Sequence, residues 1–147
     1  YVHLTSASTE GLGPSASAAA RRVLFICTGN SARSQLAAAL WRARSTIPAI
    51  SAGTQPAAAV AAGAIATAER HGLDLAAATP QHVADVMAET DFVVTVCDAA
   101  HEALGETGDL HWSVPAPGSA GTNAAFDAAF DELAARVEVL AGRLTAS

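Results

Sequence analysis

The stretch RRVLFICTGNSARSQLAAAL (21–40) places a hydrophobic run, a cysteine, a short polar loop and an Ala/Leu-rich segment in direct succession. Residues 23–26 are β-branched, apolar or aromatic, which is typical of a buried strand. Residues 34–44 carry their large apolar side chains at helical spacing, which predicts an amphipathic helix. The chain is therefore predicted to end a buried strand on Cys27, cross a small loop and enter a helix.

The remaining sequence continues this alternation of strands and helices. Further strands are predicted at 49–53, 91–97 and 110–114, and further helices at 57–71, 80–88, 98–104 and from 123 onward. Continuous apolar strands separated by helices indicate an α/β fold, with a four-stranded parallel sheet that helices cover on both faces. Such sheets bind ligands at the carboxyl ends of their strands, where both Cys27 and Cys97 are expected to lie.

Length, composition and charge narrow the possible classes of protein. The chain has 147 residues, 51% of them hydrophobic, and a net charge of −6, which fits one acidic domain and argues against nucleic-acid binding by this fragment. Residues 1–20 are rich in Gly, Ser and Ala and are expected to be a linker or the remnant of a preceding domain, with the folded domain at 21–147. No apolar run approaches the roughly 20 residues of a membrane span, and no secretory signal is evident. A soluble, cytoplasmic protein without membrane contact is expected.

The loop after the first predicted strand has the composition of an anion-binding loop. Backbone N–H groups that converge at a helix N-terminus attract oxyanions. Gly29 permits close approach of the backbone, and Asn30 tolerates a left-handed conformation. Arg33 supplies a planar fork for two oxygens of a tetrahedral anion. The predicted oxyanion-binding residues are Thr28, Gly29, Asn30, Ser31, Ala32 and Arg33.

Cys27 is the candidate nucleophile of this loop. A positive field of backbone amides and guanidinium favours the reactive thiolate over the thiol, and Ser31 and Ser34 can donate hydroxyl hydrogen bonds to the sulfur or shape the loop. The alternative is an inert, buried cysteine at the end of a core strand. The two cysteines, Cys27 and Cys97, form no CxxC or zinc pattern, and the five histidines lack ligand spacing, so no metal site is predicted.

These residues carry a family resemblance that spans about 23–140. VLFICTGNSARSQLAAAL (23–40) resembles the loop of the low-molecular-weight protein tyrosine phosphatase superfamily, in which five residues separate a cysteine from an Arg-Ser pair. Within that superfamily, the loop and the stretches SAGTQPA (51–57), ERHGLDL (69–75) and DFVVTVCDAA (91–100) are most similar to the arsenate reductases. The resemblance implies a phosphatase-like fold with a phosphate-binding P-loop, and it assigns four roles: Cys27 as nucleophile, Arg33 as oxyanion clamp, Asn30 as loop former and Ser34 as thiolate stabiliser.

Two departures from the family pattern affect the expected chemistry. VPAPG (114–118) places Ala116 where the family has an aspartic acid that protonates the leaving group, and neither Asp109 nor His111 is an obvious replacement. Loss of a general acid typically costs about 10²–10⁴ in rate. Cys97 matches the second thiol of reductases that use three cysteines, but the chain has no third. Cys97 is thus a candidate catalytic thiol or a small buried residue at a strand end.

Three functions remain open at this point. The first is reduction of arsenate to arsenite, completed by a second thiol; the second is a phosphatase that acts through phosphocysteine; the third is a weakly catalytic or non-catalytic oxyanion-binding domain attached to a regulator. The third is suggested by YVHL (1–4), which resembles the last wing strand of arsenic-responsive winged-helix repressors and points to such a domain before it. The expected partners are arsenate or phosphate and an external thiol or redoxin as reductant, with no bound cofactor.

Overall fold

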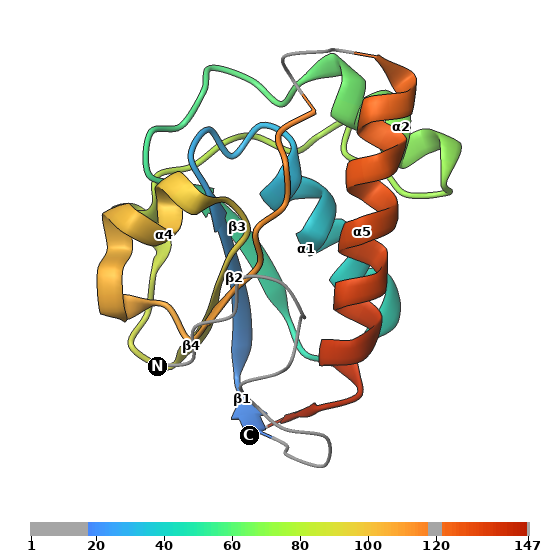
Figure 1. Ribbon diagram of the computed structural model, residues 1–147. Helices are drawn as coiled ribbons and strands as arrows, with labels where there is room; N and C mark the ends of the chain where they lie inside the picture. Colours follow the sequence, from blue (N-terminus) through green and yellow to red (C-terminus); the bar gives the residue numbers. More distant parts are fainter. Residues whose placement is uncertain (1–17, 118–121, 147) are drawn as a thin grey trace.

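The computed structural model describes residues 18–117 and 122–146, and its centre is a sheet of four parallel strands (Figure 1). The order across the sheet is β3-β2-β4-β5. The strands are β2 (Arg22–Cys27), β3 (Ala49–Gly53), β4 (Asp91–Thr95) and β5 (Leu110–His111). This topology places the ends of β2 and β4 side by side, so the predicted parallel sheet is confirmed.

Helices cover both faces of this sheet. Figure 1 shows α1 (Arg33–Arg44) and α5 (Asn123–Ala141) on one side and α4 (Asp98–Leu104) on the other. The remaining helices are α2 (Ala62–Arg70) and the single turn α3 (Val83–Val86), and a 3-10 turn, Gly105–Thr107, follows α4. The predicted α/β architecture is therefore confirmed in both its sheet and its covering layers.

The central strand β2 explains why its sequence is continuously apolar. Residues 23–26 are fully buried because helices lie on both faces of the sheet. Phe25 packs between two fully buried rings, Trp41 of α1 and Trp112 just after β5, with centroid distances of 6.1 Å and 5.8 Å. Burial of a side chain of this size stabilises the fold by about 1.5–3 kcal/mol, and it anchors the strand that ends on Cys27.

Several predicted elements are shorter than their patterns suggest. The helix predicted at 57–71 begins only at Ala62, and the one predicted at 80–88 is the single turn α3. The strands predicted at 91–97 and 110–114 end at Thr95 and His111. The late start of α2 has a clear cause, since the backbone N–H groups of Gln55, Ala57 and Ala61 are hydrogen-bonded to the loop that follows β2 rather than to one another.

A second, two-stranded sheet lies outside the predicted elements. The strand β1 (Ala18–Ala20) pairs in parallel with β6 (Leu144–Ala146). The last three residues of the segment 1–20, expected to be a linker or the remnant of a preceding domain, thus form a strand paired with β6, while 1–17 lie outside the described part of the chain. Three alanines have little intrinsic strand preference, so only their pairing with a segment far along the chain makes them a strand.

Candidate functional site

The loop from Cys27 to Ala32 is held from outside by its carbonyl groups. All six carbonyl oxygens accept hydrogen bonds of 2.8–3.2 Å. Their donors are the backbone N–H groups of Thr54, Gln55, Ala57, Ala61 and Leu36 and the side-chain amide of Gln35. The segment 54–61, which the sequence predicts to be partly helical, is thus the outer support of the loop.

This arrangement fixes the direction of the loop amides. The carbonyl and the following N–H of a trans peptide point in opposite directions, and the described residues contain no cis peptide bond. Carbonyls turned outward at 27–32 therefore turn the N–H groups of 28–33 inward. One of these, the N–H of Asn30, donates to the sulfur of Cys27 at 3.2 Å. The loop has the form of an anion cradle around Cys27.

Asn30 shapes the cradle through its backbone and its side chain. It is fully buried and adopts a left-handed φ of 51°, a conformation that asparagine tolerates better than most residues. Its side-chain amide donates to the hydroxyls of Ser34, at 2.7 Å, and Ser51, at 2.9 Å. Its side-chain oxygen accepts from the backbone N–H of Gln81 at 2.9 Å. The residue joins the loop to α1, β3 and the segment before α3.

A glycine on the neighbouring strand allows this loop to lie close to the sheet. A Cβ atom built on Gly53 of β3 would lie 2.5 Å from the carbonyl oxygen of Thr28 and 3.1 Å from atoms of Asn30. Any side chain at this position would push the loop outward. Gly53 was not singled out from the sequence, although it ends the SAG of the family-like stretch 51–57.

Ser34 completes the surroundings of the Cys27 sulfur. Its hydroxyl lies 2.9 Å from Sγ of Cys27 and accepts a hydrogen bond from Asn30. Because the Asn30 amide donates to the hydroxyl oxygen of Ser34, the hydroxyl proton of Ser34 is directed toward the sulfur of Cys27. This hydrogen bond stabilises negative charge on the sulfur. Both cysteines of the chain are free thiols and buried.

Arg33 lies where two pockets meet. Its guanidinium donates to the carbonyl oxygen of Val114 at 2.8 Å, which draws it toward the 113–117 segment. One pocket, of about 130 Å³, includes Cys27 and Arg33, and the other, of about 340 Å³, includes Cys97 and Arg33. Ala116 lines both pockets. Its side chain presents a methyl group where the family pattern would place the carboxylate of an aspartic acid.

Cys97 is held less closely than Cys27. It lies immediately before α4, and its Sγ is 3.4 Å from the backbone N–H of Ala100 and 3.4 Å from the hydroxyl of Thr28. Because Thr28 follows Cys27 directly, one hydroxyl connects the oxyanion loop with the second thiol. The two cysteines thus lie at the same edge of the sheet, as the parallel topology requires.

Sequence reasoning did not identify Asp98, which lines the same pocket as Cys97 and Arg33. Its carboxylate accepts a hydrogen bond from Nε2 of His111 at 2.9 Å. The only available signal was its position, directly after a cysteine at a strand end. Of the two residues considered as a replacement acid, Asp109 accepts from the N–H of Val93 at 2.7 Å, and His111 is buried behind Asp98.

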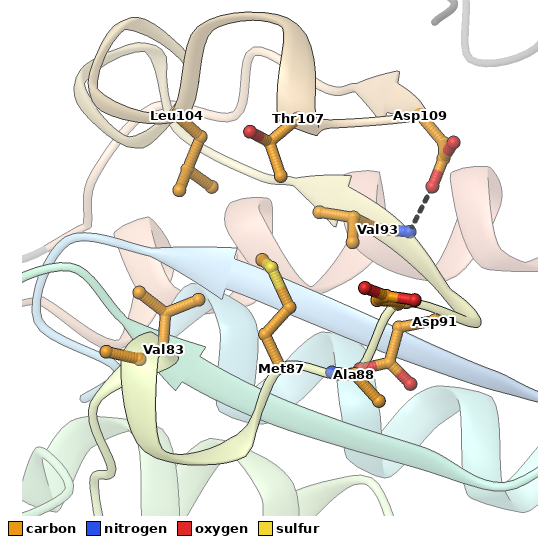
Figure 2. Close-up of a pocket in the computed structure, with 10 residues that line it drawn as sticks. Val83, Met87, Ala88, Asp91, Val93, Leu104, Thr107 and Asp109 are labelled. Carbon is orange, nitrogen blue, oxygen red and sulfur yellow. Dashed lines mark hydrogen bonds between the residues drawn. The ribbon is translucent and has the colours of Figure 1, made fainter.

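A larger pocket, of about 590 Å³, lies between α3 and α4 and contains neither cysteine. Figure 2 shows its apolar side chains, among them Met87 and Leu104, and the carboxylates of Asp91 and Asp109. Both carboxylates serve the fold, since Asp91 pairs with Arg22 at 2.8 Å and Asp109 binds the backbone of β4. The candidate residues Cys27, Arg33 and Cys97 line the other pockets.

Two further observations concern the part of the chain that the structure describes. It contains no cluster of three or more His, Cys, Asp or Glu side chains that could hold a metal ion. None of its helices is both long and apolar enough to cross a membrane.

With a cysteine in an inward-facing amide loop, an arginine at the start of the helix that follows the loop and a parallel sheet behind it, the class of protein is defined. Residues 22–147 match the model of the family described as low molecular weight phosphotyrosine protein phosphatase. The chain belongs to this family. No curated protein sequence matches it.

Solved structures similar to this chain include both reductases and phosphatases. An arsenate reductase from Archaeoglobus fulgidus is 29% identical, with a TM-score of 0.72 over 82% of this chain and 98% of that one. An arsenate reductase in a phosphate-binding state is 23% identical, with a TM-score of 0.71 over 85% and 99%. The tyrosine phosphatase AmsI of Erwinia amylovora is 20% identical, with a TM-score of 0.75 over 86% and 94%. The last two likenesses show the fold.

Proposed function

We propose that this protein reduces arsenate to arsenite through a covalent adduct on Cys27. The Cys27 thiolate attacks arsenic, and a protonated arsenate oxygen leaves as water. A second thiol then loses its proton and attacks the Cys27 sulfur, and the sulfur–arsenic bond breaks with its electron pair moving to arsenic. Arsenic is reduced from As(V) to As(III), and the two sulfurs form a disulfide, which an external thiol or a redoxin reduces.

In the first step some loop residues bind the arsenate oxygens and others orient the Cys27 sulfur. The N–H groups of 28–33 and the guanidinium of Arg33 hold the arsenate oxygens, in a cradle that is already formed before the anion arrives. Asn30 and Ser34 hold the sulfur through hydrogen bonds of 3.2 Å and 2.9 Å. The Cys27 pocket of about 130 Å³ has the scale of a small tetrahedral anion.

The observation that carries the proposal is the placement of Cys97. It lines a pocket whose wall includes Arg33, which also lines the Cys27 pocket, and it contacts the hydroxyl of Thr28 at 3.4 Å. Reduction of the adduct needs a second thiol, whereas hydrolysis of a phosphocysteine needs only water. A thiol in this position therefore favours reduction, with Cys97 as the internal candidate for the attack.

Ala116 favours the same function. Cleavage of a phosphate ester expels an alkoxide or phenoxide that requires a proton, and Ala116 cannot donate one. Arsenate loses an oxygen that its own hydroxyls or solvent can protonate. A second candidate function is phosphocysteine hydrolysis, which membership of a phosphatase family favours.

The test compares arsenate-dependent consumption of an external thiol with hydrolysis of p-nitrophenyl phosphate by the same preparation. We expect thiol consumption to be the dominant activity and Cys27→Ser to abolish it. Cys97→Ser is the matched variant, and it should slow reduction at least about tenfold at millimolar external thiol, because an internal thiol reacts at a higher effective concentration. Brisk ester hydrolysis without thiol consumption would identify a phosphatase, and oxyanion binding without either reaction would identify a binding domain.

A further inference from the structure

A carboxylate with no role in the family resemblance lies beside the second thiol. Asp98 is the first residue of α4, and 70% of its side-chain surface is exposed. It lines the 340 Å³ pocket together with Arg33 and Cys97. Despite its exposure, one carboxylate oxygen is fixed by the imidazole of His111 at 2.9 Å.

His111 is built to hold that carboxylate in one place. It is 1% exposed, and its other ring nitrogen, Nδ1, lies 2.7 Å from the hydroxyl of the fully buried Thr95. His101 of α4 stacks on the ring at a centroid distance of 4.3 Å. A buried imidazole with hydrogen bonds at both nitrogens cannot rotate freely, so the position of Asp98 is set by the core of the sheet.

The groups around Asp98 keep it ionised. Hydrogen bonds from His111 and then from Ser113 lower the pKa of Asp98, with smaller effects from the charges of His111 and His101. Arg33, from α1, adds a cation to the same pocket. A carboxylate of this kind is a poor proton donor near neutral pH, but it is available as a proton acceptor.

The two pockets place Asp98 on the side from which a second reactant arrives. Once an adduct forms, its oxygens fill the smaller pocket around Cys27. The neighbouring pocket, which meets it at Arg33 and Ala116, holds the internal thiol Cys97 and the exposed carboxylate of Asp98. A thiol or water that approaches the adduct must lose a proton, and Asp98 is the ionised carboxylate in that pocket.

We propose that Asp98 is the catalytic base that accepts the proton of the nucleophile that resolves the Cys27 adduct, and that His111 is its positioning residue. This proposal rests on the proposed function and specifies its second step. The thiol transfers its proton to the Asp98 carboxylate as its sulfur bonds to Cys27, the sulfur–arsenic bond breaks toward arsenic, and arsenite leaves. Asp98 then returns the proton to solvent. If water is the nucleophile, oxygen bonds to phosphorus and Cys27 leaves as a thiolate.

The experiment mixes the full chain with arsenate and a fixed glutathione concentration and follows arsenite release from about pH 3, below the ordinary aspartate pKa, to about pH 9. Asp98→Asn should slow release roughly 10²-fold at pH 7, the scale of general-base catalysis, and the residual rate should rise with hydroxide. Asp98→Glu should recover most of the rate. Arsenate should still protect Cys27 from iodoacetamide in Asp98→Asn as it does in the wild type. Glu102→Gln is the matched control, because Glu102 is an exposed carboxylate on the same helix.

His111 is tested by the acidic limb of the same profile. A base works above its own pKa, and the pKa of Asp98 is lowered by its hydrogen bonds, so the wild-type rate should begin to fall only below the ordinary range of an aspartate pKa. His111→Gln removes the main cause of the lowering and should move this limb to higher pH, a change that a purely structural role would not produce. Ser113→Ala, which leaves the core intact, should move it in the same direction by less.

The outcomes separate the two proposals. If the wild type releases arsenite and Asp98→Asn does so equally fast, the assignment of the base is wrong and reduction stands. If the wild type releases none, reduction is wrong, and the same variants are compared in the breakdown of phosphocysteine after a burst of p-nitrophenol. Slower breakdown in Asp98→Asn supports the base, and unchanged breakdown overturns it. No adduct with either substrate overturns both proposals.

Discussion

The two cysteines lie at the carboxyl ends of neighbouring strands and are equally buried, at 3% exposure each, yet they are held in different ways. Two groups approach Cys27, the hydroxyl of Ser34 at 2.9 Å and the N–H of Asn30 at 3.2 Å. The contacts of Cys97 with Thr28 and the N–H of Ala100 are both longer, at 3.4 Å.

This difference matches the two tasks of a thiol pair. A nucleophile that must attack a bound oxyanion benefits from a site that is organised before the anion arrives. All six carbonyls of the loop 27–32 accept hydrogen bonds, so the loop around Cys27 is organised in advance. A thiol that must reach an adduct formed elsewhere requires freedom to move, and the contacts of Cys97 are the longer ones. Variants on each side should therefore differ in effect.

The first prediction is a gain of function at position 116, whose side chain lines both the Cys27 pocket and the Cys97 pocket. Ala116→Asp restores a proton donor beside Arg33 and should raise hydrolysis of p-nitrophenyl phosphate by about 10²–10⁴-fold, the usual contribution of a general acid. Ala116→Asn is the matched control, since it has the same shape without the acidic proton. The measurement is steady-state release of p-nitrophenol. If the two variants hydrolyse the ester equally, the family acid has another substitute in this chain.

Arg33→Ala should give the next largest effect, on the Cys27 side. Loss of one preorganised oxyanion-binding group costs roughly 10²–10³-fold, so phosphate and arsenate should bind at least 10²-fold more weakly by calorimetry. Arg33→Lys should also bind poorly, because a point charge does not replace the planar fork. Arg21→Ala removes an exposed arginine near the start of β2 and serves as control. Unchanged affinity in Arg33→Ala would remove Arg33 from the site.

The last prediction concerns stability and compares the surroundings of Cys27 with those of Cys97. Asn30→Ala removes the hydrogen bonds of the Asn30 side chain with Ser34, Ser51 and the N–H of Gln81 and should lower the free energy of unfolding by roughly 3 kcal/mol. Thr28→Val removes one contact with Cys97 and should cost about 1 kcal/mol or less. Urea denaturation of both variants measures the difference. Equal losses would mean that the two thiols are held equally firmly.

Much of the candidate site was predictable because its parts are close together in the sequence. Cys27, Asn30, Arg33 and Ser34 lie within eight consecutive residues that join a buried strand to a helix. In such a segment the turn from strand to helix already determines which groups face the anion. The final helix was predictable for a similar reason, as Thr122 caps it through a hydrogen bond to the N–H of Ala125, three residues away.

The remaining parts of the site depend on contacts between distant segments. Asp98 and His111 are thirteen residues apart in different elements, and Thr95 contacts His111 only because β4 and β5 are neighbours in the sheet. The segment 54–61 supports the loop because four of its N–H groups donate to the carbonyls of 27–29 and Ser31. No pattern within a few residues predicts the Asp98–His111 contact or the support of the loop by segment 54–61.

The sequence by itself thus determined the parallel α/β sheet, the position of Cys27 at a strand end and the loop that surrounds it. These features follow from the period of apolar residues and from backbone preferences at Gly29 and Asn30, which act over a few residues. The tertiary structure was needed to show that Asp98 and Cys97 share a pocket with Arg33 and that Ala18–Ala20 form a strand. The physical reason is that strand order and register bring together residues that the chain separates, and these depend on packing across the whole core.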